Sequence, residues 1–180
     1  EAVGSGRPFL GICVGMQMLF DASDEDPGAR GLGVIPGTVA WVPAGVPRPQ
    51  MQWNRLTLRV EDPMFDGLGE NPWMYFVHSL HGVPDRADAV AATTEYGSVL
   101  NVVFRCDNVV ATQFHPEANE AIVSGWMSGE GAMELVKAGI SPSDLMDETR
   151  RQVERSGPAA EHLVDWFLLE VASTPMPKIR

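Results

Sequence analysis

The stretch PFLGICVGMQMLF, residues 8–20, decides the fold, because two apolar runs meet there at a cysteine held between glycines. PFLGI, which Gly11 closes, is typical of a short buried strand. The segment MQMLFDAS predicts a helix, since Met16, Leu19 and Phe20 fall at i, i+3 and i+4 on one helical face. We therefore expect a strand that turns sharply into a helix at the cysteine.

The turn itself, Gly11-Ile12-Cys13-Val14-Gly15, has the form of a nucleophile elbow with cysteine in place of serine. Such a turn needs small neighbours, so that the nucleophile stands exposed on a strained backbone. The positive end of the following helix favours a thiolate, and the N–H of Val14 becomes a candidate oxyanion donor. Because most free thiols are simply buried, the elbow alone leaves a structural cysteine open as the alternative.

A second group of reactive residues is QFHPE, residues 113–117, which closes the apolar run NVVATQF. Residues i and i+2 of a strand point to one face, so His115 and Glu117 are placed as a base and the carboxylate that orients it. Pro116 has no N–H to offer a ladder, which suits the end of a strand. The alternative is that His115 caps a helix and Glu117 begins it. Together with the elbow, the motif predicts a Cys-His-Glu triad.

Composition limits the kind of protein this is. The sequence has 180 residues, enough for one domain with a real core, and its net charge of −11 argues against nucleic acid or an anionic membrane as a partner. Its two cysteines, Cys13 and Cys106, favour a reducing compartment over a disulfide framework, so we expect a cytoplasmic protein. It has no apolar run of membrane-spanning length, no signal-peptide pattern and no zinc-type ligand spacing.

Strand-like and helix-like segments are separated along the chain. Strands are expected in the front part, at residues 34–42, 55–60, 73–80, 89–96, 100–106 and 108–114, with a Pro-rich connection at 43–54. Helices are expected at residues 121–139 and 142–172, with Ser141 as the N-cap before Pro142. We therefore expect a catalytic unit at 1–120 and a helical extension at 121–180 that packs on it.

LGICVGMQ at 10–17 and QFHPE at 113–117 resemble the signature pair of class I, triad-type glutamine amidotransferases. The stretches at 50–54, 74–84 and 90–97 narrow the resemblance to the glutaminase subunit of imidazole glycerol phosphate synthase, from histidine biosynthesis. The resemblance covers residues 7–117, about 60% of the chain. It implies an α/β, flavodoxin-like fold with a mixed, mainly parallel sheet flanked by helices.

By resemblance, Cys13 is the nucleophile, His115 the base and acid, and Glu117 the orienting carboxylate. Val14 supplies an oxyanion N–H, and Gln17 helps to hold the amino-acid end of the substrate. The implied reaction is hydrolysis of glutamine to glutamate and ammonia through a cysteinyl thioester, without metal or organic cofactor.

Two further sets of residues take roles from the same resemblance. His78-Ser79-Leu80 would line the glutamine pocket, and Trp53 and Tyr75 would face a partner synthase. That partner would be a (β/α)₈-barrel cyclase, which forms a heterodimer with the glutaminase and receives its ammonia through a tunnel. Taken without the family, Trp53 in a Pro-rich segment is more typical of packing than of an interface.

The sequence departs from the family in three ways. Only 12 residues precede Cys13, so we expect the first strands and a Gly-rich oxyanion loop to be absent, with weakened activity. Ala118-Asn119 stand where the family has Lys-Ser, and Gln50 and Gln52 where it tends to have His and Gly, which puts docking to a cyclase in question.

The third departure is that 63 residues follow Glu117, a tail more like that of GMP-synthase-like amidotransferases. Two alternatives therefore stay open beside the histidine-pathway glutaminase. The chain could be a class I amidotransferase that serves another acceptor, or a catalytically impaired glutamine-binding module.

Overall fold

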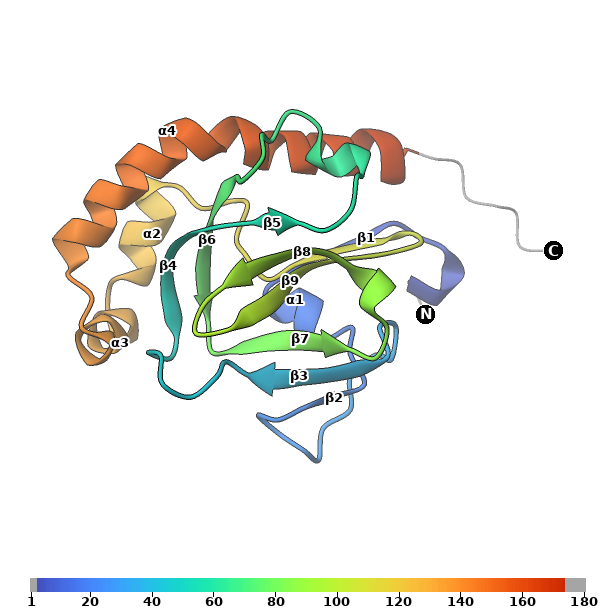
Figure 1. Cartoon of the computed structure of the whole chain (residues 1–180), viewed down its shortest axis with the longest axis horizontal. Helices are drawn as coiled ribbons and strands as arrows, with labels where there is room; N and C mark the ends of the chain where they lie inside the picture. Colours follow the sequence, from blue (N-terminus) through green and yellow to red (C-terminus); the bar gives the residue numbers. More distant parts are fainter. Residues whose placement is uncertain (1–2, 174–180) are drawn as a thin grey trace.

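Two β-sheets form the centre of the computed structural model, which describes residues 3–173, and the C-terminal helices lie along one side of them (Figure 1). The larger sheet has the path β1-β10-β9-β7-β3-β2, with β8 and β5 joined to it through β9. Its strands are β1 (Phe9–Ile12), β2 (Ala22–Ser23), β3 (Gly37–Trp41), β5 (Thr57–Leu58), β7 (Leu80–Pro84), β8 (Val90–Glu95), β9 (Val99–Cys106) and β10 (Val109–Thr112). The smaller sheet pairs β4 (Gln50–Arg55) with β6 (Trp73–His78).

The expected strand-to-helix turn is present. β1 runs parallel to β10 with Ile12 opposite Thr112, and α1 (Val14–Gln17) begins directly after Cys13. The helix is shorter than predicted, because the carbonyl of Leu19 accepts from the N–H groups of residues 34 and 35 instead of from its own helix. The apolar face that predicted the helix is nevertheless buried, and consists of Met16, Leu19 and Phe20.

The sheet is mixed, as expected, but it is not mainly parallel. Among the described strands, only the pairs β1–β10 and β2–β3 are parallel. For β9 and β10 the physical reason is the short connection, since a two-residue turn can join only antiparallel neighbours. Asp107 and Asn108 form such a turn between β9 and β10, with Asp107 at φ 47°.

Two strand predictions were wrong in position. The Pro-rich connection contains β4, while the stretch expected as a strand at 55–60 keeps only β5. In β4 the side chains of Gln50, Met51 and Trp53 are buried against the rest of the protein. Local composition favoured a loop, but pairing with β6 satisfies the backbone and tertiary contact overrides propensity.

The C-terminal part is helical, in three helices rather than two. These are α2 (Glu120–Trp126), α3 (Glu130–Ala138) and α4 (Pro142–Trp166), which continues as a short π-helical turn, η4 (Phe167–Val171). Gly129, at φ 57°, separates α2 from α3, and the Ser141 hydroxyl accepts from the N–H of Asp144 as the predicted cap of α4. Short 3₁₀ turns are η1 (Val3–Ser5), η2 (Pro63–Phe65) and η3 (Ala87–Ala89). No helix within residues 3–173 is long and apolar enough to cross a membrane.

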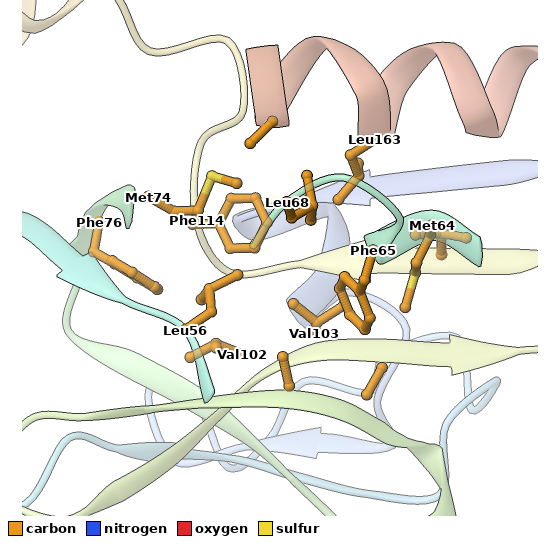
Figure 2. Close-up of a cluster of buried hydrophobic side chains, with 14 of the residues drawn as sticks. Leu56, Met64, Phe65, Leu68, Met74, Phe76, Val102, Val103, Phe114 and Leu163 are labelled. Carbon is orange, nitrogen blue, oxygen red and sulfur yellow. The ribbon is translucent and has the colours of Figure 1, made fainter. Parts of the chain in front are cut away.

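The long helix α4 shares a hydrophobic core with the sheets. Figure 2 shows Leu163 of α4 directed toward the buried side chains of η2, with Met74 and Phe114 in the same cluster. At the far end of α4, the Arg105 guanidinium lies 4.7 Å from the Trp166 ring and 3.2 Å from the Asp62 carboxylate. These contacts fix α4 along one side of the molecule, above β5 in Figure 1.

Candidate functional site

Cys13 lies at the junction of β1 and α1 with a backbone that few residues adopt. Its φ is 50° and its ψ is −109°, and its N–H donates to the carbonyl of Thr112 at 2.8 Å. A cysteine in such a conformation stores strain on the order of 1–3 kcal/mol, which is typical of functional turns. Gly11 is required beside it, because a Cβ there would lie 2.9 Å from the carbonyl oxygen of Gly15.

The start of α1 supplies a donor beside the sulfur. Val14 is the first residue of the helix, so its N–H has no acceptor within the helix. Its side chain is 62% exposed, and that of Met18 one turn later is 54% exposed. The nucleophile side of the site is therefore apolar and open.

The Cys13 sulfur is also contacted by two groups from distant segments. The amide Nε2 of Gln113, which is fully buried, lies 3.5 Å from Sγ, and the carbonyl of Val77 lies 4.0 Å away. On its other side Gln113 accepts from Nε2 of Gln17 at 3.3 Å. Gln17, predicted as a substrate contact, is thus linked to the Cys13 sulfur through the side chain of Gln113.

His115 and Glu117 form the predicted pair, although not as part of a strand. β10 ends at Thr112, and His115 is held instead by its N–H, which donates to the carbonyl of Tyr75 at 2.9 Å. Pro116 follows at once and has no N–H to extend a ladder. The carboxylate of Glu117 nevertheless accepts from Nδ1 of His115 at 2.7 Å, which leaves Nε2 for the sulfur side.

The surroundings of this pair change both pKa values. Burial lowers the pKa of His115, but the neighbouring Cys13 and Glu117 outweigh it and raise the pKa from 6.5 to about 9. Burial raises the pKa of Glu117, but the hydrogen bond from His115 outweighs it and lowers that pKa. Nε2 of His115 is buried and makes no hydrogen bond of normal geometry within the described residues. His115 is thus held in one orientation and charged near pH 7, with its second nitrogen placed where it could give or take a proton.

Aromatic residues from the smaller sheet and α2 surround the base. The Trp126 ring lies 4.6 Å from the His115 ring, edge to face, and stacks on Tyr75 at 5.6 Å. The Trp53 ring lies 5.6 Å from Tyr75, and its indole N–H donates to Oγ1 of Thr149 on α4 at 3.1 Å.

The expectation that Trp53 and Tyr75 face a partner is not met by their positions here. Trp53 is 6% exposed and Tyr75 is fully buried, and burial raises the pKa of the Tyr75 hydroxyl to about 12. The reason is the C-terminal helices, since α2 and α4 cover the surface that the two side chains would otherwise present. In the described chain the two residues pack the base side of the site.

The stretch His78-Ser79-Leu80 joins β6 to β7, next to the Val77 carbonyl that faces Cys13. The His78 ring is not free for a ligand, because Nδ1 donates to the Leu80 carbonyl at 2.7 Å and Nε2 is paired with the side-chain amide of Gln50 at 2.9 Å. Burial lowers the pKa of His78 to about 4, so the ring is neutral. The stretch can therefore contribute its backbone and Ser79 to a pocket, but not a charged imidazole.

Sequence reasoning missed two residues of this site. Gln113 belongs to the quoted QFHPE motif and lies two residues before His115. This position in the motif could have identified it as a residue of the site. Trp126 carried no such signal, because its contact with His115 depends on where α2 folds back. Within residues 3–173, no group of three His, Cys, Asp or Glu side chains could hold a metal ion.

The amino-acid sequence is similar to sequences of known proteins. The sequence model of the glutamine amidotransferase class-I family matches residues 1–122. Among curated proteins, the chain is 44% identical over 140 residues to imidazole glycerol phosphate synthase subunit HisH of Salinibacter ruber, covering 74% of this chain and 64% of that protein. It is 43% identical over 118 residues to the HisH subunit of Pyrococcus furiosus, covering 65% and 60%. The chain thus spans about 60% of the length of the curated relatives it matches.

Solved structures resemble more of the chain at lower identity. A glutamine amidotransferase from Thermotoga maritima superposes with a TM-score of 0.75 and 20% identity, covering 94% of this chain and 66% of the other. One from Methylobacillus flagellatus gives a TM-score of 0.68 and 18% identity, covering 93% and 64%. At these identities the likeness concerns the fold, and it extends over the C-terminal helices.

Proposed function

This chain belongs to the class I glutamine amidotransferase family, and we propose that it hydrolyses glutamine to glutamate and ammonia with Cys13 as the nucleophile. One observation carries the proposal. The strained elbow at Cys13 and the His115–Glu117 pair, about a hundred residues apart in sequence, follow the paired strands β1 and β10, and Cys13 is close enough to contribute to the raised pKa of His115.

In the proposed reaction, Nε2 of His115, whose raised pKa of about 9 keeps the ring charged near pH 7, already holds the proton taken from Cys13. The Cys13 sulfur then attacks the side-chain amide carbon of glutamine. The N–H of Val14 donates to the oxyanion that forms. His115 then gives its proton to the departing ammonia, which leaves a γ-glutamyl thioester on Cys13.

The second half of the reaction uses the same residues. His115 takes a proton from water, the hydroxide attacks the thioester, and glutamate leaves as the Cys13 sulfur is released. Glu117 holds Nδ1 of His115 throughout, at 2.7 Å, and stabilises the charged ring. We further propose that Gln17 and the backbone of His78-Ser79-Leu80 line the pocket for the amino-acid end of glutamine.

The acceptor of the ammonia is proposed from the relatives. Several are named as the HisH subunit of imidazole glycerol phosphate synthase, so we propose a cyclase of (β/α)₈-barrel fold as the partner of this chain, in a heterodimer. In such a heterodimer, the partner would dock on a chain in which Trp53 and Tyr75 are buried and in which α3 and α4 are present. We also keep, as a proposal, the division into a catalytic unit at 1–120 and a helical extension at 121–180.

The proposed chemistry is tested at the two cysteines. Replacing Cys13 with serine should lower glutaminase activity by on the order of 10⁴-fold or more, because no other group can form the thioester. Cys106→Ser, at the end of β9, is the matched control and should keep the activity of the unchanged protein. Activity that survives in Cys13→Ser would contradict the assignment.

Two further measurements separate the alternatives. An electrophilic glutamine analogue should label Cys13 stoichiometrically; glutamine binding without such labelling would identify a binding module instead. Ammonia transfer measured with and without the histidine-pathway cyclase would show whether that enzyme is the acceptor. Glutaminase activity that the cyclase neither stimulates nor consumes would favour another acceptor.

A further inference from the structure

The buried side chain of Gln113 links the nucleophile to Gln17. Its amide Nε2 donates to Sγ of Cys13 at 3.5 Å, and its Oε1 accepts from Nε2 of Gln17 at 3.3 Å. We propose that Gln113 is a positioning residue, which holds the Cys13 sulfur by an N–H donor whose direction Gln17 fixes. The inference rests on the proposed function, in which Cys13 is the nucleophile.

The direction of the amide follows from what each partner can do. A glutamine amide has an accepting oxygen at one end and a donating NH₂ at the other. Because Nε2 of Gln17 can only donate, it takes the oxygen of Gln113 and leaves the NH₂ group facing the sulfur. Gln113 is fully buried, so water cannot replace either partner.

The backbone on both sides of this amide is also fixed. The N–H of Gln113 donates to the Val102 carbonyl at 2.8 Å, which ties it to β9. The preceding residue, Thr112, accepts from the N–H of Cys13 at 2.8 Å and donates its hydroxyl to the Phe114 carbonyl at 3.0 Å. The backbones that carry the donor and the sulfur are therefore held in register by hydrogen bonds.

A donor in this position can stabilise negative charge that develops on the sulfur, because an N–H bond to sulfur strengthens when the sulfur carries a charge. Among the titratable groups, Cys13 and Glu117 act on His115, and His115 in turn acts on His78 of β6, as does His81 of β7. Burial lowers the pKa values of His78 and His81, so these rings are neutral near pH 7. Unlike His115, Gln113 stabilises the sulfur without titrating itself.

The test measures the rate at which iodoacetamide alkylates Cys13 as a function of pH, followed by peptide mass spectrometry to separate Cys13 from Cys106. In Gln113→Met, which keeps the volume but has no N–H, the pH of half-maximal rate should rise by about one unit. This corresponds to a roughly tenfold slower alkylation at pH 7. Because alkylation needs no turnover, the result stands whether or not the chain hydrolyses glutamine.

Gln152→Met is the matched control, since Gln152 is a buried glutamine on α4 that bonds to Glu148 and not to the site. Its alkylation profile should equal that of the unchanged protein. Gln113→Glu has the same shape but presents no N–H as a carboxylate, and it should shift the profile at least as far. If Gln113→Met does not fold, the alkylation profile of Gln113→Glu tests the proposal in its place.

Gln17→Met tests the second half of the inference. It should raise the half-maximal pH by less than Gln113→Met does, and it should have no further effect in a Gln113→Met background, because the two residues act in series. Folded Gln113 variants with an unchanged profile would overturn the proposal. Additive effects of Gln17 and Gln113 would overturn the role of Gln17 in directing the amide.

Discussion

The two halves of the candidate triad are built in opposite ways. The nucleophile comes from a short local turn and stands beside exposed apolar side chains, Val14 at 62% and Met18 at 54% exposure. The base is enclosed, because Trp126 lies against the His115 ring and α4 closes over Trp53. The crevice left between His115 and α4 has a volume of about 10 Å³, at most the space of one water.

The two sides of the site therefore depend on different features of the structure. On the nucleophile side the backbone is the sensitive part, because the elbow depends on a close approach between Gly11 and the first turn of α1. On the base side the sensitive part is packing between elements that are distant in sequence. Substitutions on the two sides should therefore fail for different reasons.

The largest effect is expected at Gly11. Gly11→Ala would place a Cβ 2.9 Å from the Gly15 carbonyl oxygen, against backbone that cannot move aside without changing the elbow. We expect a loss of about 1–3 kcal/mol in the free energy of unfolding, measured by urea denaturation, and a loss of glutaminase activity. Gly15→Ala is the control, since nothing lies within 4 Å of its Cβ, and it should be neutral or stabilise by up to about 1 kcal/mol. Equal effects of the two changes would contradict a specific close approach at Gly11.

The next effect concerns the charge of the enclosed base. Because the pKa of His115 is raised from 6.5 to about 9, protonation of His115 stabilises the fold fully below pH 6.5. That contribution is lost as the pH rises through about 9. Glu117→Gln removes one cause of the shift, so the NMR titration midpoint of His115 should fall by about one unit.

The same variant should lose part of the stability difference between pH 6 and pH 9.5, measured by urea denaturation. Comparing it with the unchanged protein cancels the contributions of other titrating groups. A His115 midpoint that stays near 6.5 in the unchanged protein would contradict the enclosed, paired geometry of the base side.

The smallest effects contrast the two sides directly. Thr149→Val leaves the buried indole N–H of Trp53 without its acceptor at 3.1 Å, and it should lower the free energy of unfolding by about 1–2 kcal/mol. Met18→Gln, on the open side, should change it by less than about 0.5 kcal/mol. Thermal or urea unfolding of both variants measures the contrast. A Met18 variant as unstable as the Thr149 variant would mean that the nucleophile side is covered after all.

Much of the site could be predicted from the sequence because its signals are local. The glycine spacing around Cys13 specified the elbow, and the His-x-Glu order specified a pair that hydrogen-bonds even outside a strand. The fold class followed from the same motifs, whereas strand β4 and the antiparallel character of the sheet did not. Strand partners depend on segments that are far apart, and local composition carries little information about them.

What the sequence by itself determined is therefore the set of candidate groups: which cysteine, which histidine and which carboxylate, and the turn that carries the first of them. Only the tertiary structure decided how these groups are surrounded. It placed Gln113 between Cys13 and Gln17, and Trp126 against His115. The reason is physical, because a backbone turn is set by a few adjacent residues, while burial is set by every element that packs around it.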